Sequence, residues 1–259
     1  MPMMSSAYCK GTARMEQTGP NFYDDEAVFA TYIRRRQGRD TPNDTLEKPV
    51  MMDLIRPITG KRILDLGCGD AAIGRELLDG GAASYTGIEG SHKMTAVATK
   101  TLADTDGQII EQTIENWMYP QAAFDLVIAR LSLHYVADLA PICTQIFHTL
   151  TPAGLFVFSV EHPVITSSDA GWTSGTLRQD WIVDNYFTTG LRVTDWLGGT
   201  VQKYHRTVED YFHLLNAAGF MIEDLREACP QREHFHDVQT YERRKRIPLF
   251  LIFAARKPR

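Results

Sequence analysis

Short apolar runs alternate with longer segments in which apolar residues recur at helical spacing. The runs predict strands over 61–66, 84–89, 108–113, 124–129, 154–160, 220–225 and 249–255. The helical spacing predicts helices near 72–80, 91–101, 138–150 and 207–218. Strands that alternate with helices are typical of a parallel sheet with right-handed crossovers. The pattern therefore predicts an α/β fold with helices on both faces of the sheet.

The two ends of this alternation divide the chain. Residues 1–20 are polar and aperiodic, and we expect them to be flexible. Residues 21–58 carry two helical patterns and predict an N-terminal helical cap. The main domain then spans 59–259, and its aromatic, glycine-rich stretch at about 161–206 is too long for an ordinary connection. We interpret that stretch as a substrate-binding insertion after the fifth strand.

Composition restricts the possible partners and location. The formal net charge of −5 argues against a nucleic-acid partner. The four cysteines form no CxxC pair, so we expect no metal site and reduced thiols in a cytoplasmic protein. We also expect no membrane association, because no apolar run is long enough to cross a bilayer.

The stretch Lys61-Arg-Ile-Leu-Asp-Leu-Gly-Cys-Gly-Asp-Ala-Ala-Ile-Gly74 joins a strand to a helix through a glycine turn. Open α/β sheets bind nucleotide-like ligands at such turns. Gly67, Gly69 and Ala72 fit the nicotinamide pattern GxGxxG/A only loosely. Asp65 would face the pyrophosphate of a dinucleotide, and it instead suits a ligand with a cationic end and no phosphates.

The pattern Asp65-x-Gly67-x-Gly69 resembles motif I of the class I S-adenosylmethionine-dependent methyltransferases, of the small-molecule type. The acid that ends the second strand, Glu89, and the stretch Gly90-Ser91-x-x-Met94 match later motifs of that family. The resemblance implies a doubly wound, mainly parallel, seven-stranded Rossmann-like sheet with an antiparallel last strand. It also implies S-adenosylmethionine as cofactor and S-adenosylhomocysteine as product.

The resemblance assigns cofactor-binding residues by position. Glu89 would accept the ribose hydroxyls, Ile114 would pack on the adenine, and Arg35 in the cap would meet the methionine carboxylate or close the pocket. The full expected set is Asp65, Gly67, Cys68, Gly69, Glu89, Gly90, Ser91, Met94, Thr113, Ile114, Glu115, Ala129, Arg130, Tyr23, Tyr32 and Arg35.

The methyl acceptor should lie beyond the carboxyl ends of the strands. His134 and His162 are the candidate general bases, since imidazole titrates near neutrality. The expected acceptor-binding residues come from the same loops and the insertion: Tyr135, Glu161, Tyr186, Arg192, Trp196 and Tyr204. An Asn/Asp-Pro-Pro-Tyr/Phe motif is absent after the fourth strand, which favours a small-molecule acceptor, aromatic or heterocyclic, methylated on O or N.

Three alternatives stay open at this point. The acceptor is a macromolecule such as tRNA or protein, the chain is an NAD(P)-dependent oxidoreductase, or it is an inactive cofactor-binding regulatory subunit. The sequence is compatible with a monomer or a homodimer.

Overall fold

The computed structural model describes residues 19–36, 38, 40–173 and 180–259. Its centre is a seven-stranded sheet of order β3-β2-β1-β4-β5-β9-β8. Neighbouring strands from β3 to β5 run parallel, whereas β9 runs antiparallel to both β5 and β8. The strands are β1 (Arg62–Leu66), β2 (Ser84–Glu89), β3 (Gln108–Glu111), β4 (Phe124–Arg130), β5 (Leu150–Glu161), β8 (Met221–Arg226) and β9 (Phe250–Arg256). The predicted sheet, including its antiparallel last strand, is confirmed.

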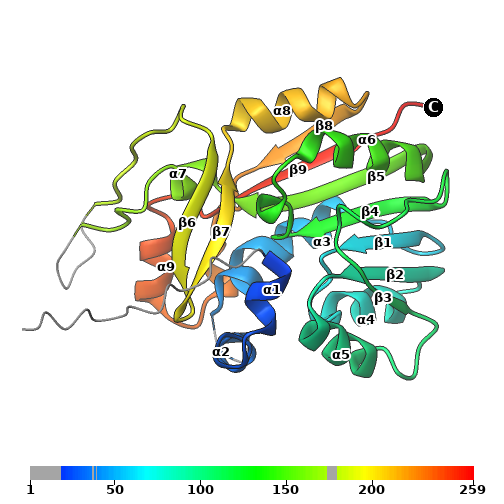
Figure 1. Ribbon diagram of the computed structural model, residues 1–259, viewed down its shortest axis with the longest axis horizontal. Helices are drawn as coiled ribbons and strands as arrows, with labels where there is room; N and C mark the ends of the chain where they lie inside the picture. Colours follow the sequence, from blue (N-terminus) through cyan, green and yellow to red (C-terminus); the bar gives the residue numbers. More distant parts are fainter. Residues whose placement is uncertain (1–18, 37, 39, 174–179) are drawn as a thin grey trace, which may run out of the picture.

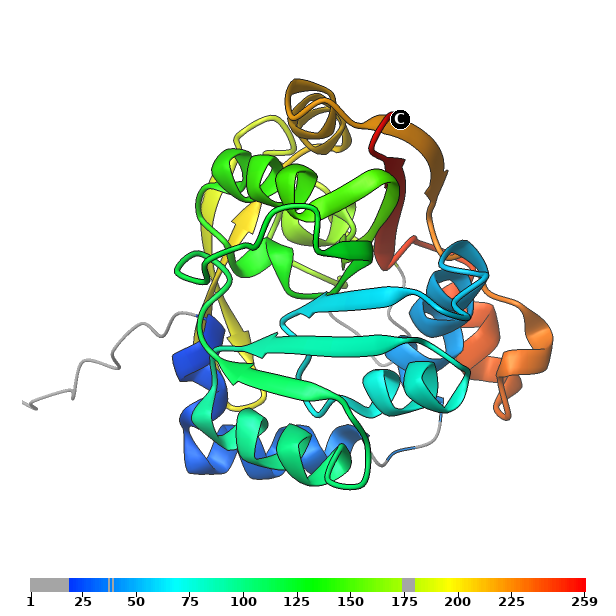
Figure 2. The ribbon, with the colours of Figure 1, turned by 90° about the vertical axis from the view of Figure 1, so that its right-hand side faces the viewer.

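Helices cover both faces of the sheet (Figures 1 and 2). The helices α6 (Leu139–Thr149) and α8 (Val208–Ala217) pack on one face, and α3 (Lys48–Leu54), α4 (Ala72–Asp79) and α5 (His92–Thr101) pack on the other. Alternate residues of each strand enter opposite cores: Leu66 meets the α6 side, while Ile63 meets the α4 side. This two-sided burial explains why β4, β5 and β9 are rich in apolar residues.

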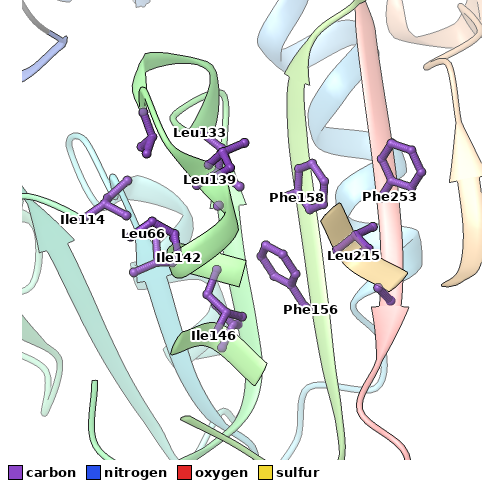
Figure 3. Packing of buried hydrophobic residues seen from close by; sticks show 14 of the residues in the cluster. Leu66, Ile114, Leu133, Leu139, Ile142, Ile146, Phe156, Phe158, Leu215 and Phe253 are labelled. Carbon is purple, nitrogen blue, oxygen red and sulfur yellow. The ribbon is translucent and has the colours of Figure 1, made fainter. Parts of the chain in front are cut away.

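The core on the α6 and α8 side is built from large side chains. Phe156, Phe158 and Phe253 stack across β5 and β9, with ring centroids 4.9 and 5.5 Å apart. Ile142 and Leu215 reach this layer from the two helices, as Figure 3 shows. The sheet is therefore fixed rigidly beneath the loops that leave its carboxyl edge.

The N-terminal segment supplies both a cap and part of the domain wall. Helices α1 (Gly19–Asp24) and α2 (Glu26–Arg36) are followed by a π-helical turn, η1 (Asn43–Glu47), which continues into α3. Met51 and Ile55 bury completely against the sheet. The second predicted helix, near 46–57, is thus a layer of the main domain. Of residues 1–20, which were expected to be flexible, 1–18 lie outside the described residues, whereas Gly19 and Pro20 begin helix α1.

The insertion contains elements that the sequence pattern does not predict. A short helix, α7 (Pro163–Thr166), is followed by a two-stranded hairpin of β6 (Gly190–Trp196) and β7 (Gly199–His205). The hairpin lies beside α1 and α2 (Figure 1), and Val201 packs on Phe22 and Val28. Two 3-10 turns, η2 (Leu133–Tyr135) and η3 (Arg232–His234), and helix α9 (Val238–Arg244) complete the structure.

Within the described residues, no helix is both long and apolar enough to cross a membrane, and no group of His, Cys, Asp or Glu side chains is placed to hold a metal ion. The described cysteines, Cys68, Cys143 and Cys229, are free thiols.

Candidate active site

The glycine turn after β1 lies at the middle of the sheet, where the strand order reverses between β2 and β4. Gly67 has a φ of +75°, and its N–H donates to the Ile88 carbonyl at 2.8 Å. A Cβ on Gly67 would lie 2.5 Å from the Cβ of Ser132, which follows β4. Only glycine therefore lets the two loops approach this closely.

Asp65 is buried below this turn. Its Oδ2 accepts a hydrogen bond of 2.7 Å from the Tyr85 hydroxyl, while its Oδ1 is buried without a partner among the described residues. Burial raises the pKa of Asp65 from 3.8 to about 7, although Tyr85 and Arg130 act in the opposite direction. An unsatisfied, buried carboxylate oxygen is costly, so this atom calls for a cationic hydrogen-bond donor.

Glu89 ends β2 and faces the same turn. Its two carboxylate oxygens accept hydrogen bonds of 2.9 Å from the backbone N–H groups of Gly69 and Ser91. Burial raises the pKa of Glu89, and these backbone donors oppose the rise. The Ser91 hydroxyl donates to Asp24 at 2.7 Å and so ties helix α1 of the cap to the start of α5.

One cavity of about 700 Å³ joins this turn to the loops, the cap and the insertion. Expected cofactor residues that line it are Gly67, Gly69, Glu89, Gly90, Met94, Thr113, Ile114, Glu115, Arg130, Tyr23, Tyr32 and Arg35. A smaller hollow of about 80 Å³, lined by Asp65 and Cys68, shares Tyr32, Gly67, Gly69 and Arg130 with it. Expected acceptor residues on the cavity wall are His134, Tyr135, Glu161, Trp196 and Tyr204.

Other expected site residues lie away from the cavity wall. His162 caps helix α7, because its Nδ1 accepts from the Val164 N–H, and its Nε2 contacts Glu227 at 3.0 Å. The Tyr186 carbonyl meets His205, and the exposed Arg192 donates to backbone carbonyls of its own segment. Ala129 and Ser91 are buried behind the wall. His162, Tyr186 and Arg192 thus have structural partners instead of a place at the cavity.

His134 lines the cavity, and its Nδ1 is buried without a hydrogen-bond partner in the described part of the chain. Burial lowers the pKa of His134 to about 4, and the Glu161 carboxylate counteracts part of this effect. Lys203 donates to Glu161 at 2.7 Å, and despite burial this ammonium and His134 lower the pKa of Glu161. A neutral imidazole therefore lines the cavity, and the Glu161 carboxylate partly offsets the effect of burial on its affinity for a proton.

Three tryptophans of the insertion, Trp172, Trp181 and Trp196, line the cavity. Trp172 and Trp181 meet edge-to-face with ring centroids 5.5 Å apart. Trp196 carries Arg35 of helix α2 over its ring at 4.5 Å, and Lys203 lies 5.2 Å from the same ring. A cation–π contact therefore holds the Arg35 side chain on the Trp196 ring, at the part of the cavity wall that the insertion forms.

Sequence reasoning missed several lining residues. Trp172 and Trp181 lie in the insertion, and Phe250 begins β9. The position of Phe250 was open to inference, because the amino end of an antiparallel strand lies at the carboxyl edge of its parallel neighbours. Arg36 and Asn43 line both hollows from the cap, and no local pattern marks them.

The sheet order, the glycine turn and the strand-end acid define a Rossmann-like domain that binds a nucleoside cofactor at its switch point. A family model for a methyltransferase domain matches residues 64–158. A solved S-adenosylmethionine-dependent methyltransferase from Mesorhizobium loti is 36% identical, with a TM-score of 0.76, over 81% of this chain and 97% of that one.

Two further relatives agree with this match. A structure from Listeria monocytogenes, proposed to be of the same class, is 31% identical with a TM-score of 0.77, over 82% of this chain and 97% of that one. A ubiquinone biosynthesis O-methyltransferase from Xylella fastidiosa is 31% identical over 61% of this chain and 65% of that protein. The chain belongs to the class I S-adenosylmethionine-dependent methyltransferases. It is a methyltransferase that uses S-adenosylmethionine, and the nicotinamide alternative is set aside.

Proposed function

We propose that the enzyme methylates an oxygen or nitrogen of a small, planar acceptor, and that both ligands share the 700 Å³ cavity. The observation that carries this proposal is the continuity of that cavity, which joins the motif residues around Gly67 to the wall around Trp196. A cavity closed by the chain's own cap and hairpin suits a small molecule better than a folded macromolecule.

The residues present fit the cofactor. The orphaned Asp65 Oδ1 would accept from its amino group, Glu89 would hold the ribose hydroxyls, and Ile114 would pack on the adenine. When bound, the cofactor supplies an activated methyl group on a sulfonium. The protein's task is then mainly to align the acceptor, which is a large part of the rate enhancement in such reactions.

His134 is the group placed to accept the acceptor's proton. Its imidazole is neutral near pH 7. Burial lowers its pKa to about 4 and so weakens it as a base, and the Glu161 carboxylate, which favours the imidazolium, would offset part of this loss. The cations on Trp196 make that ring a poor partner for a cationic acceptor and favour a neutral or anionic aromatic one. The similarity to an O-methyltransferase of ubiquinone biosynthesis supports transfer to oxygen.

Labelled methyl transfer tests this function. The protein is incubated with methyl-labelled cofactor and a panel of phenols, N-heterocycles and amines, and label in small products is measured by mass spectrometry. We expect label in a phenol or heterocycle. Label in tRNA or protein alone would overturn the small-molecule proposal, and tight cofactor binding with no labelled product from any source would indicate an inactive subunit.

A further inference from the structure

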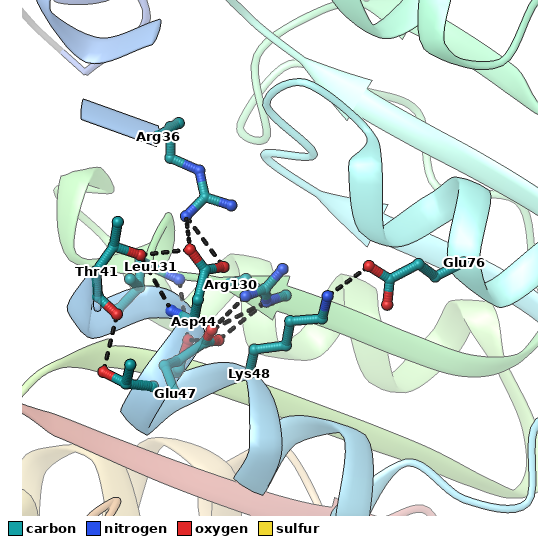
Figure 4. A network of polar contacts seen from close by, with 10 residues as sticks. Arg36, Thr41, Asp44, Glu47, Lys48, Glu76, Arg130 and Leu131 are labelled. Carbon is teal, nitrogen blue, oxygen red and sulfur yellow. Dashed lines mark hydrogen bonds and ion pairs between the residues drawn. The ribbon is translucent and has the colours of Figure 1, made fainter. Parts of the chain in front are cut away.

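An ion pair between Glu47 of η1 and Arg130 joins the N-terminal segment to the carboxyl end of β4 (Figure 4). Arg130 Nε donates to the two oxygens of Glu47 at 3.0 and 3.1 Å, and its Nη2 also donates to this carboxylate. The Ser159 hydroxyl of β5 donates to the same carboxylate at 2.8 Å. Glu47 is completely buried, and the Arg130 side chain is 16% exposed. The Glu47 carboxylate is thus held by donors from both β4 and β5.

This ion pair lies at the point where the two hollows meet. Arg130 lines both of them, next to Gly67 and Gly69. Its Nη1 makes no hydrogen bond to the described residues, so one donor is left for a ligand. The loop behind it is constrained, because Leu131 adopts a φ of +53° and donates to the Ser159 carbonyl at 3.0 Å.

The charge of Arg130 matters because the cofactor is itself cationic. S-adenosylmethionine carries a positive sulfonium that S-adenosylhomocysteine lacks, while the rest of the two molecules is the same apart from the methyl group. An unpaired guanidinium at the junction would repel the first ligand more than the second. Burial by itself lowers the pKa of Arg130. The contacts with the Glu47 carboxylate have a larger effect in the opposite direction, so the pKa of Arg130 is raised. The arginine stays charged, and its charge is balanced by Glu47.

We propose that Glu47 is a positioning residue that holds Arg130 at the cofactor site and balances its charge, so that the site tolerates a sulfonium. Arg130 then contributes a hydrogen-bond donor with little net repulsion. The inference rests on the proposed placement of the cofactor in the shared cavity, and it does not depend on which acceptor is methylated.

Calorimetry with both ligands tests this inference in the full-length protein. In Glu47→Gln we expect the preference for S-adenosylmethionine over S-adenosylhomocysteine to fall about tenfold relative to wild type, the size of one added unit charge at a partly buried site. In Arg130→Gln the fraction of Glu47 that stays ionised without its partner should raise that preference, by at most about tenfold. The double variant should return it to within about threefold of wild type.

The matched control is Asp125→Asn. Asp125 pairs with Arg62 at 3.0 Å at the opposite end of β1 and β4, so its loss should leave the preference unchanged. If Glu47→Gln and Arg130→Gln each weaken the binding of both ligands by the same factor, the ion pair has only a structural role and the inference is overturned. If Glu47→Gln does not fold, Arg130→Gln and the double variant decide the question in the same way. Failure of the wild type to bind either ligand would instead contradict the placement of the cofactor.

Discussion

Replacing Asp65 by Asn should change the pH dependence of stability. In the folded protein without ligand, burial holds the pKa of Asp65 at about 7, against 3.8 for an exposed carboxyl. The folded state therefore binds more protons than the unfolded state between these values, and stability falls as pH rises through this window. Full ionisation of Asp65 costs about 4 kcal/mol of unfolding free energy, since each pKa unit is worth about 1.4 kcal/mol.

Asn does not titrate, so the difference between variant and wild type isolates this cost. The difference in unfolding free energy between Asp65→Asn and wild type should therefore change with pH. From about pH 5 to about pH 8 it should shift by about 3 kcal/mol in favour of the variant. For a domain of this size, that corresponds to about 5–10 °C in Tm. Effects of the substitution on packing and on the Tyr85 hydrogen bond are the same at both pH values and cancel.

The assay is urea unfolding of both proteins at the two pH values, without ligand. Asp125→Asn is the control. Arg62 holds the pKa of Asp125 below its usual value, so this carboxyl is ionised in both the folded and the unfolded protein between these two pH values. A difference between Asp65→Asn and wild type that stays constant with pH would refute the claim that Asp65 is protonated in the free protein. Calorimetry should also show that S-adenosylhomocysteine binds wild type more tightly as pH rises from about 6 to 8 and that the variant loses this dependence.

Three further substitutions test the site. Gly67→Val should abolish measurable binding of S-adenosylhomocysteine in calorimetry, since its side chain would collide with Ser132; affinity within about tenfold of wild type would contradict this. Glu89→Gln should weaken the same ligand about 10- to 100-fold, because charged hydrogen bonds to the ribose become neutral, and an unchanged Kd would exclude that role. His134→Gln should lower kcat about 100-fold or more with an unchanged Kd for S-adenosylhomocysteine, and normal turnover would remove His134 as the base.

The sheet and its helices could be predicted because each depends on a local pattern. The strand 61–66 is observed as Arg62–Leu66, and the helix 91–101 is observed as His92–Thr101 with Ser91 as its N-cap. In both cases the residues that define the ends, a turn or a cap, adjoin the apolar pattern. Local chemistry was therefore sufficient to place these elements.

The hairpin at 190–205 could not be predicted in the same way. Leu191 and Val193 of β6 are exposed, so the strand lacks the usual pattern of apolar residues on a buried face. Its turn uses Leu197 and Gly198, both at positive φ, instead of the Asn-Gly pair that marks such turns. The hairpin packs on Phe22 and Val28, and a contact between such distant segments leaves no trace in either one.

The candidate site also contains residues that local sequence patterns predict and residues that only the fold brings together. Asp65 and Glu89 lie at the carboxyl ends of β1 and β2, and Gly67 follows β1, so their meeting at one edge of the sheet follows from the order of the elements. Glu47 and Arg130 are brought together only by the fold, and neither residue type indicates a buried pair by itself. His162 follows the fifth strand as well, but the chain turns immediately into α7, and its ring is used as a cap.

The proposed acceptor wall around Trp196 and the proposed cofactor site around Gly67 are supported by different parts of the chain, yet the cap touches both. Asp24 of α1 fixes the start of α5 through Ser91, while Arg35 of α2 lies on Trp196 of the hairpin. Substitutions in the hairpin can therefore change the shape of the acceptor wall and leave the motif residues on the rigid sheet in place. A change in α1 or α2 acts on both ligands at once. Under the proposed function, selection of the acceptor would therefore depend mainly on the insertion, and closure of the site would depend on the cap.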